Sequence, residues 1–476
     1  MSGKTFLHSV ILRIIKMSDD QRTSKKVTLL VTTVGAFIVP FMSSSINIAL
    51  PSIGKEFAMN AVVLSWVTTA YVLAAASFQV PLGRIADIYG RKKMFLLGFA
   101  IHTFFSGLCA ISNNPLLLIL FRFLQGIGGS MNFSVGVVIL ISVFPFEERG
   151  KVLGICIAAV YLGLSCGPFL GGVITHALGW RAIFFLNVPI GILIILFTLL
   201  KMKGEWTEAK GESFDLTGTV FFSTSLAAII YGLSLLPETG GILFILLGAF
   251  LLLAFVRWEL RIKAPLFNID LFKRNKVFAF SNLAAFINYS ATSTVSFLLS
   301  LYLQFIKGFD PGKAGLILIS QPVIQAIFSP FAGKLSDRIE PRRVASIGMA
   351  MTAIGLFLFN FLSDRTATPF IIANLAFMGL GFALFSSPNT NAVMSSIEKK
   401  SYGVASGTLG TMRSLGMMFS MGMVMLLFSL YIGRVQITPS SYPLFIKSIK
   451  VAFVIFTALC VAGIFASLSR GRMRKA

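Results

Sequence analysis

Long apolar runs separated by short polar segments dominate this sequence of 476 residues. Most runs hold about 18 to 30 residues, which lets a helix cross the ~30 Å hydrocarbon core of a bilayer. Fourteen such runs lie at residues 27–50, 62–82, 94–111, 115–144, 152–177, 182–200, 216–236, 242–256, 277–306, 314–331, 344–362, 369–397, 402–432 and 451–468. The eighth is shorter and is expected to extend to Trp258. The pattern predicts an all-α polytopic membrane protein with fourteen transmembrane helices.

The composition supports this fold class and excludes others. Hydrophobic residues make up 56% of the chain and charged residues 12%, whereas a soluble domain carries about 25% charged residues. So few charges cannot cover a surface that faces water. Soluble enzymes, nucleic-acid-binding proteins and disordered proteins are therefore excluded.

The basic residues predict the orientation in the membrane. The net charge is +23, and 31 of the 41 lysines and arginines fall on one side of the predicted helices, against 8 on the other. Positively charged loops stay in the cytoplasm. We therefore expect a multi-pass protein of the plasma membrane with both termini cytoplasmic.

The first residues form an apolar and basic stretch, Phe6 to Lys16. It is too short to span a bilayer and is followed by no small-residue cleavage site, so a signal peptide is not expected. Either the stretch lies on the membrane surface, or translation starts at Met17.

A polar motif occurs twice, at a distance of 250 residues. Gly83, Asp87, Gly90, Arg91 and Lys92 follow the second run, and Gly333, Asp337 and Arg338 belong to the segment after the tenth run. Glycine permits a tight turn, and a carboxylate beside basic groups can form a latch that breaks when helices move. The alternative is an ordinary positively charged turn.

The repeat predicts two parallel halves. We expect a cytoplasmic segment at 1–26, a six-helix half at 27–200, a linker with two inserted helices at 201–276, a second six-helix half at 277–468 and a basic tail at 469–476. Parallel repeats with this spacing are typical of secondary transporters.

The fifth run contains glycines at a four-residue spacing. Gly163, Gly167 and Gly171 share one helix face, and such small faces allow helices to approach closely. Pro168 removes one backbone hydrogen bond and kinks the helix. Close packing is expected here; the open question is whether it also seals one conformation.

Ionisable residues inside the runs are the candidates for ion coupling. Arg122 precedes Gln125 and Gly126, and an arginine in the membrane costs at least ~2.5 kcal/mol without a partner. Arg413 lies about 16 Å into its helix at ~1.5 Å per residue. His102 could titrate near neutral pH. The alternatives are an arginine satisfied by carbonyl groups and a histidine that only packs.

These motifs resemble the major facilitator superfamily, in particular its fourteen-helix drug:proton antiporter branch (EmrB/QacA-like). The loop from Gly83, the segment from Arg122 to Gly129 and the segment from Gly163 to Gly172 resemble the family's loop, proton-transfer and antiporter motifs. The resemblance extends from about residue 27 to 468. It implies the major facilitator fold, with two pseudo-symmetric halves of six helices plus two inserted helices.

The sequence departs from this branch in its first helix. Met42 stands where the branch usually carries an aspartate, and all 18 acidic residues can be placed outside the predicted spans. A buried acid is the usual carrier of a proton and the usual attractor of a cationic drug. We therefore expect neutral or anionic cargo, with coupling through Asp87 or His102.

Polar side chains within the apolar helices are candidates for contact with cargo. They are Asn47, Gln79, Asn132, Asn187, Asn282, Asn288, Gln304 and Gln325, with Met42 as a ninth candidate in the first helix. Each could instead bond one helix to another, and we expect fewer than half to touch cargo.

Together these features predict a secondary transporter that is not an enzyme. We expect export of small amphipathic compounds by proton antiport through alternating access, because no nucleotide-binding loop is present. The alternative is a transporter of a specific neutral or anionic metabolite with weak or no proton coupling. No cofactor, metal site or nucleic-acid partner is expected, and the protein is expected to be a monomer in the bilayer.

Overall fold

A computed structural model describes residues 3–262, 265–267, 269–397 and 402–471. Side chains are not described for residues 3–23, 146, 147, 149–151, 269, 270, 337, 402 and 403. The tail from 472 to 476 lies outside the described residues. Side chains of the stretch Phe6 to Lys16 lie outside them as well, although its backbone is helical.

Helices account for nearly all of the described chain. Their bounds are α1 Gly3–Glu56, α2 Ala61–Tyr89, α3 Arg91–Ala110, α4 Pro115–Val143, α5 Phe146–Leu178, α6 Arg181–Lys201, α7 Leu216–Leu235, α8 Thr239–Glu259, α9 Ile269–Arg274, α10 Lys276–Thr292, α11 Val295–Leu301, η1 Tyr302–Ile306, α12 Pro311–Leu318, α13 Ser320–Arg338, α14 Pro341–Leu358, η2 Phe359–Phe361, α15 Thr368–Ser395, α16 Tyr402–Tyr431, η4 Pro439–Ser441 and α17 Tyr442–Leu468.

The fourteen spans expected from the apolar runs are confirmed within the described residues. Two expected single helices are divided: the ninth span consists of α10, α11 and the π-helix η1, and the tenth of α12 and α13. The ninth divides at Ser293 and Thr294, hydroxyl residues that compete with the backbone for hydrogen bonds. The expected boundary at residue 26 is not a break, since α1 runs through it.

Short polar residues at the ends of the apolar runs start several helices. The side chains of Asn60, Asn114 and Asn275 each accept a hydrogen bond at 2.9 Å from a backbone N–H three residues later. This arrangement satisfies a donor that the first helical turn leaves free. The polar segments between runs therefore set the helix starts as well as the loops.

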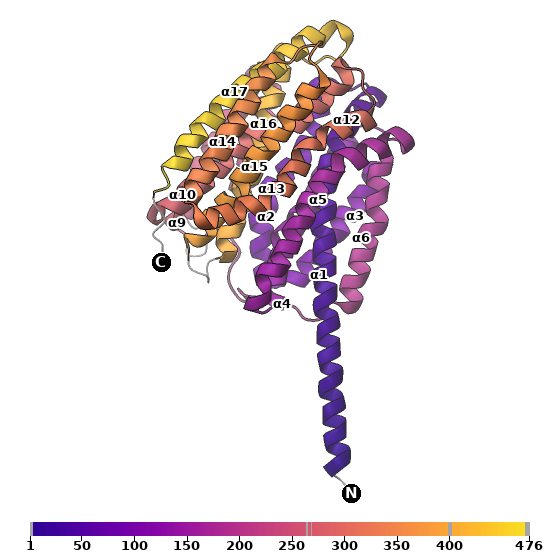
Figure 1. Ribbon diagram of the computed structural model, residues 1–476, viewed down its shortest axis with the longest axis vertical. Coiled ribbons are helices and arrows are strands. Elements are labelled where there is room, and N and C mark those ends of the chain that lie inside the picture. The colour runs from indigo at the N-terminus through magenta and orange to yellow at the C-terminus, as the bar shows by residue number, and fades with distance from the viewer. Residues whose placement is uncertain (1–2, 263–264, 268, 398–401, 472–476) are drawn as a thin grey trace.

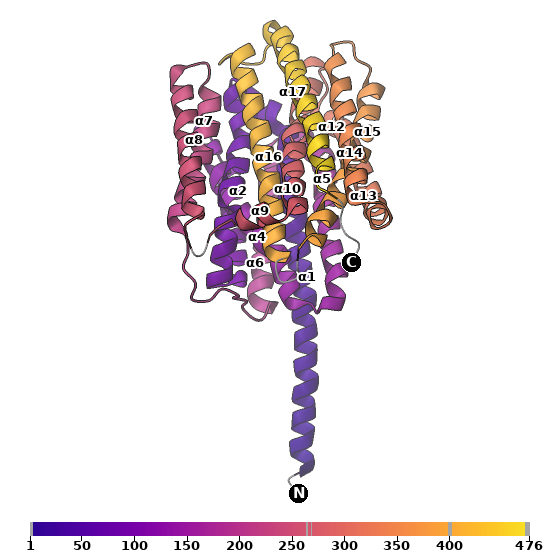
Figure 2. The same ribbon diagram turned by 90° about the vertical axis from the view of Figure 1, so that its left-hand side faces the viewer.

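The helices form two bundles with a hairpin at one edge (Figures 1 and 2). Helices α1–α6 pack together, as do α10–α17. The inserted helices α7 and α8 form a hairpin, and α7 contacts α2 of the first bundle and α16 of the second. Both chain termini lie at the same end of the molecule, here called the terminal face; the other end is the opposite face.

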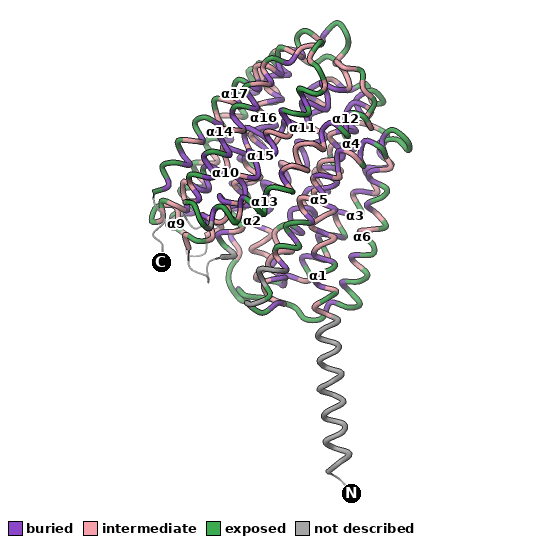
Figure 3. Tube along the Cα trace, in the orientation of Figure 1, coloured by how far each residue is buried: buried purple, intermediate pink, exposed green. Residues whose placement is uncertain are grey.

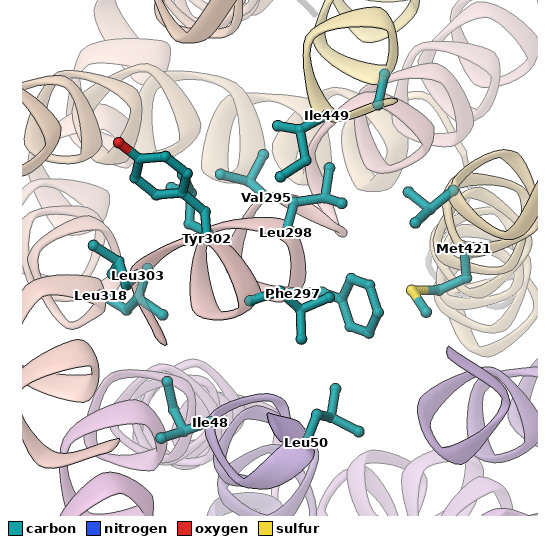
Figure 4. Packing of buried hydrophobic residues seen from close by; sticks show 14 of the residues in the cluster. Ile48, Leu50, Val295, Phe297, Leu298, Tyr302, Leu303, Leu318, Met421 and Ile449 are labelled. Atoms are coloured by element: carbon teal, nitrogen blue, oxygen red, sulfur yellow. The ribbon is translucent and has the colours of Figure 1, made fainter. Parts of the chain in front are cut away.

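One apolar core joins the two bundles at the opposite face. It includes Ile48 and Leu50 of α1 and Phe297, Leu298 and Tyr302 of the second bundle, all at most 1% exposed (Figure 4). Exposing one such side chain to water costs about 1.5–3 kcal/mol. Separating the bundles here is therefore unfavourable unless contacts form elsewhere.

Hydrogen bonds between the bundles reinforce this closure. Ser300 donates to the Asn47 carbonyl oxygen at 2.7 Å, and the amide of Gln304 in the π-helix donates to the Ile48 carbonyl oxygen at 3.0 Å. Gln436 donates to the Ala58 carbonyl oxygen at 2.9 Å. These contacts fix α1 against the second bundle.

Buried residues also follow the helices toward the terminal face (Figure 3), where they belong to several cores. One core comprises residues of the first bundle, among them Phe95 and Ile139. Another comprises residues of the second bundle, among them Phe278 and Leu409. A third core joins α2, α7 and α16 and includes Leu73, Phe222 and Met418. The two bundles therefore share one large core at the opposite face and a smaller joint core with the hairpin nearer the terminal face.

Candidate functional site

Arg122 is the centre of a buried polar network in the first bundle. Its side chain is 0% exposed. Its Nε donates to the Val67 carbonyl oxygen at 3.1 Å, and Nη1 donates to Gln125 Oε1 at 2.6 Å. Gln125 in turn donates to the Ser106 hydroxyl oxygen at 2.6 Å. Helices α2, α3 and α4 are linked through this arginine.

Aromatic rings cover the guanidinium. The Tyr71 ring lies 4.4 Å from Arg122 Cζ and the Phe184 ring 5.9 Å away, both within the range of a cation–π interaction. Gly129 makes room for Tyr71, because a Cβ there would lie 2.2 Å from its hydroxyl oxygen. Among the described residues, neither Arg122 Nη2 nor the Tyr71 hydroxyl has a hydrogen-bond partner.

His102 lies at the edge of the Arg122 network. Its Nδ1 is 3.4 Å from the Gln125 carbonyl oxygen, and its ring meets Tyr71 edge-on at 6.4 Å between centroids. Nε2 is buried without a partner in the described part of the chain. The structure thus brings two sequence-predicted coupling candidates, Arg122 and His102, close together.

Arg413 occupies a separate site on α16, well inside the helix. Its Nη2 donates to the Thr390 hydroxyl oxygen at 2.7 Å, and its Cζ lies 5.6 Å from the Tyr289 ring centroid. The Tyr161 hydroxyl lies 3.2 Å from the Ser386 hydroxyl oxygen and joins α5 to α15 across the bundles. Hydroxyl groups and an aromatic ring, rather than a carboxylate, accompany this arginine.

The glycine face of α5 packs against α1. A Cβ on Gly163 would lie 2.3 Å from the Phe37 carbonyl oxygen, and one on Gly171 would lie 2.6 Å from Ser45 Cβ. At Gly167 the Ser45 hydroxyl donates to the backbone oxygen at 3.0 Å. Only glycine permits this approach of two backbones.

The same helix also contacts the second bundle closely. A Cβ on Gly172 would lie 2.3 Å from the Pro311 carbonyl oxygen, and one on Gly315 would lie 2.1 Å from the Pro168 carbonyl oxygen. Helices α5 and α12 therefore cross at a contact made by glycine on each side. The sequence analysis did not identify Gly315.

The first polar repeat is a helix junction rather than an open loop. Helix α2 continues to Tyr89, and α3 begins at Arg91. Gly90 alone separates them, with a φ of +124° that an L side chain rarely adopts. The expected loop from Gly83 is thus wrong in form, because one glycine suffices to reverse the chain.

Acidic residues hold the basic groups of this junction. Arg91, only 3% exposed, bonds to Asp87 and Glu208, both at 2.7 Å. Its Nη1 also donates to the Ser142 hydroxyl oxygen at 2.7 Å. Arg91 therefore joins α2, α3 and α4 to the linker after α6.

The linker at 202–215 packs against the junction between α2 and α3. Glu208 N and Ala209 N both donate to the Asp87 carbonyl oxygen, at 3.1 and 3.0 Å. Lys92 N donates to Glu205 at 2.8 Å, and Lys92 Nζ donates to the Met202 carbonyl oxygen. The linker therefore packs against the junction between α2 and α3.

The second repeat lacks such a clamp in the described part of the chain. Gly333 lies in α13, where a Cβ would lie 3.0 Å from the Ser387 hydroxyl oxygen, and Arg338 at the end of α13 is exposed. The Asp337 side chain lies outside the described residues. Among the described residues of this segment, Arg342 pairs with Glu340 at 3.0 Å.

Asn132 lines a small hollow of about 50 Å³ between α1, α3, α4 and α5. The walls are apolar and include Phe95, Phe99, Val137 and Val160. Both polar atoms of the Asn132 side chain are buried without a partner among the described residues. A hollow of this volume has room for a few water molecules and is smaller than the usual site for a drug-sized compound.

The other cavity candidates lie elsewhere and mostly contact protein. Met42 Sδ accepts from Asn187 Nδ2 at 2.7 Å. Gln79 accepts from Ser414 at 2.7 Å and links α2 to α16. The remaining candidates are Asn47, which accepts from Thr68 at 3.4 Å, Asn282, whose amide donates within α10, Asn288, which is 0% exposed, and Gln325, which is 6% exposed.

The expectation that every acidic residue lies outside the spans needs correction, because Glu56, Asp87 and Glu259 fall at the ends of their spans. Of these, Glu259 is the most deeply buried. Glu259 is the last residue of α8 and is only 3% exposed. It faces Asp215, which caps the start of α7 and is 5% exposed. The apolar run predicted the helix, but α8 extends beyond the run and carries its final carboxylate into the packed hairpin.

Comparisons with known proteins agree with this architecture. The family model described as Major Facilitator Superfamily matches residues 32–280 and 282–475. The riboflavin transporter RibZ of Clostridioides difficile is 31% identical over 398 residues, which cover 84% of this chain and 86% of that protein. The multidrug transporter protein MdtP of Bacillus subtilis is 29% identical over 425 residues, 86% and 76% of the two chains.

A solved structure shares the fold. The crystal structure of a bacterial homologue of the human lysosomal transporter Spinster, inward-facing and unoccupied, superposes with a TM-score of 0.69 at 15% identity. The match covers 95% of this chain and 99% of that one. The fourteen spans, the paired bundles and the family match lead to one conclusion: the chain belongs to the major facilitator superfamily and is a membrane transporter, not an enzyme.

Proposed function

We propose that this transporter exports small amphipathic compounds in exchange for protons, as the fourteen-helix drug:proton antiporter branch does. The observation that carries the proposal is the extensive closure at the opposite face, where the bundles share one large core. Toward the terminal face each bundle also has a core of its own, and α2 and α16 meet through a third core. Alternating access requires a second state in which these relations are reversed.

The charge distribution supports an orientation for this closure. With 31 basic residues on the side of the termini and 8 on the other, the terminal face is proposed to be cytoplasmic in a plasma membrane. The closed core would then lie on the outer side. A transporter that loads cargo from the cell needs this state.

The contacts of Arg91 support a latch at the terminal face. Moving α2 relative to the linker requires breaking the bonds of Arg91 to Asp87 and Glu208. Arg91 is 3% exposed, whereas Glu208 is 70% exposed and Asp87 34% exposed, so both carboxylates keep contact with water when the bonds break. Such bonds can hold one state and still break during transport.

The embedded charges support a cargo that is neutral or anionic. Arg122 and Arg413 lie well inside their helices, and their described partners are carbonyl, amide, hydroxyl and aromatic groups. A lipophilic cation would meet uncompensated positive charge near Arg413. Relatives named for riboflavin and for multidrug transport are both compatible with this preference.

Transport by inverted membrane vesicles tests the preference for charge. Three fluorescent amphiphiles of similar size, one cationic, one neutral and one anionic, are offered under the same pH gradient. We expect the cation to be accumulated about tenfold more slowly than the others, which corresponds to ~1.4 kcal/mol. Replacement of Arg413 by glutamine should reduce the difference in accumulation rate between the cation and the other two compounds. Replacement of the exposed Arg338 by glutamine should leave this difference unchanged. Equal or faster accumulation of the cation by the unmodified protein would contradict this preference.

A second candidate function is transport of one defined metabolite with weak or no proton coupling. Met42 favours it, because this buried thioether accepts a hydrogen bond from Asn187 at a position where the branch usually has a titratable aspartate. Accumulation of one neutral or anionic compound that does not respond to a pH gradient would support this candidate.

A further inference from the structure

Two buried carboxyl groups meet at the terminal end of the inserted hairpin. Asp215 precedes α7 and is 5% exposed, and Glu259 ends α8 and is 3% exposed. Gly218 leaves the space between them: a Cβ there would lie 2.0 Å from Asp215 Oδ2 and 3.1 Å from Glu259 Oε1. The two oxygens therefore lie on either side of one small volume.

Three of the four carboxyl oxygens accept hydrogen bonds from described donors. Asp215 Oδ1 accepts from Gly218 N at 2.8 Å and from Trp258 Nε1 at 2.9 Å. Glu259 Oε1 accepts from Leu266 N at 3.2 Å, and Oε2 accepts from Phe267 N at 3.0 Å. Asp215 Oδ2 is buried and receives no donor from the described residues. It lies beside the second carboxyl group instead.

The described surroundings of the two carboxyl groups supply no compensating charge; Lys263 lies outside the described residues. No ion pair joins either carboxylate to a lysine, arginine or histidine in the described chain. Arg84 of α2 pairs with Glu212, and Arg257 and Arg261 are exposed.

Aromatic rings enclose the rest of the site. Phe222, Phe255 and Phe267 pack against one another at centroid distances of 5.1 to 6.1 Å. Two like charges in such an apolar enclosure repel strongly.

We infer that Asp215 and Glu259 bind a proton and share it between Asp215 Oδ2 and Glu259 Oε1. The proton supplies the donor that Asp215 Oδ2 lacks and removes one of two adjacent negative charges. A metal ion fits less well, because Na⁺, Mg²⁺ and Ca²⁺ need more oxygen ligands than the two that face each other here. No described group of three or more metal-binding side chains occurs in the chain.

The proton has a structural consequence for the joint between the hairpin and the second bundle. The Glu259 carboxylate accepts hydrogen bonds from the backbone N–H groups of Leu266 and Phe267, which precede α9 and α10. Asp215 ends the linker that contacts Asp87 and Arg91. Loss of the proton would push α7 and α8 apart at this joint. The inference does not depend on the proposed function, because the proton is bound whether or not export is coupled to it.

Infrared titration of the purified full-length protein in lipid nanodiscs tests this site. We expect a protonated-carboxyl C=O band at neutral pH that disappears on alkaline titration. The band should be lost both in Glu259→Gln and in Asp215→Asn, where an amide N–H replaces the shared proton. Glu238→Gln is the matched control: it lies at the other end of the same hairpin and pairs with Arg434, and it should retain the band.

Thermal unfolding gives a second readout. The melting temperature of the unmodified protein should fall as the pH rises through loss of the proton, and this fall should be absent in Glu259→Gln. If one amide variant does not fold, the other provides the same comparison. Absence of the band at neutral pH, its persistence in the amide variants, or its removal by Na⁺ at constant pH would overturn the proposal.

Discussion

Replacement of Arg122 by methionine is expected to reduce cargo transport by at least about tenfold. The side chain keeps its length but loses its bonds to the Val67 carbonyl oxygen and Gln125 Oε1. A hydrogen bond to a charged group is worth about 1.5–3 kcal/mol, and ~1.4 kcal/mol is a factor of ten. Uptake into proteoliposomes, normalised to the amount of folded protein, measures the effect.

Two further variants separate the role of the guanidinium from a general loss of charge. Arg122→Lys keeps the charge but cannot bridge both acceptors. Its transport rate should therefore lie between those of Arg122→Met and the unmodified protein. Arg434→Met removes an arginine that is 50% exposed and pairs with Glu238 at 3.1 Å, and it should transport normally. Normal transport by Arg122→Met would show that the buried network is dispensable.

Replacement of Gly163 by valine is expected to abolish transport. A Cβ at this position would lie 2.3 Å from the Phe37 carbonyl oxygen, a backbone atom that cannot rotate away. Overpacking of this kind costs about 1–3 kcal/mol, and here it would force α5 away from α1. The loss should be visible as failed uptake at unchanged protein level, with a lowered melting temperature.

Gly154 provides a matched control on the same helix. Its added Cβ would have no atom within 4 Å, so Gly154→Val imposes the same change of helix propensity without the clash. We expect nearly normal uptake from it. Equal behaviour of the two valine variants would contradict the assignment of the glycine face to close helix packing.

Periodicity and length were enough to predict most of the fold. Fourteen apolar runs correspond to the fourteen spans, because only a helix satisfies its own backbone in lipid. Asn60, Asn114 and Asn275 mark helix starts that their side chains cap. The glycine face of α5 was also predictable, since its spacing fixes the side of the helix on which it lies.

The partners of the site residues could not be predicted in this way. Tyr71 and Val67 contact Arg122 from another helix, and Thr390 contacts Arg413 from α15. Hydrophobicity identifies helices but does not determine their rotation against each other. The clamp of the linker on Arg91 was missed for a related reason, because Glu208 meets it only after the chain has folded back.

The Asp215–Glu259 contact shows the limit of reading charge from sequence. Both residues flank apolar runs and were placed in polar segments by that criterion. Gly218, three positions after Asp215, removes the side chain that would otherwise separate the two carboxyl groups. A contact that depends on a missing Cβ leaves a weak signal in a single sequence.

Proton exchange by the reconstituted protein tests the central claim most directly. A pH gradient is imposed across proteoliposomes that contain the protein, and a neutral amphiphile is supplied as cargo. Accumulation of the cargo and the internal pH are recorded at the same time. The account predicts that the gradient drives accumulation of the cargo, that cargo addition moves protons in the opposite direction, and that Arg122→Met prevents both. Cargo movement that is insensitive to the gradient and unaccompanied by any proton flux would contradict it.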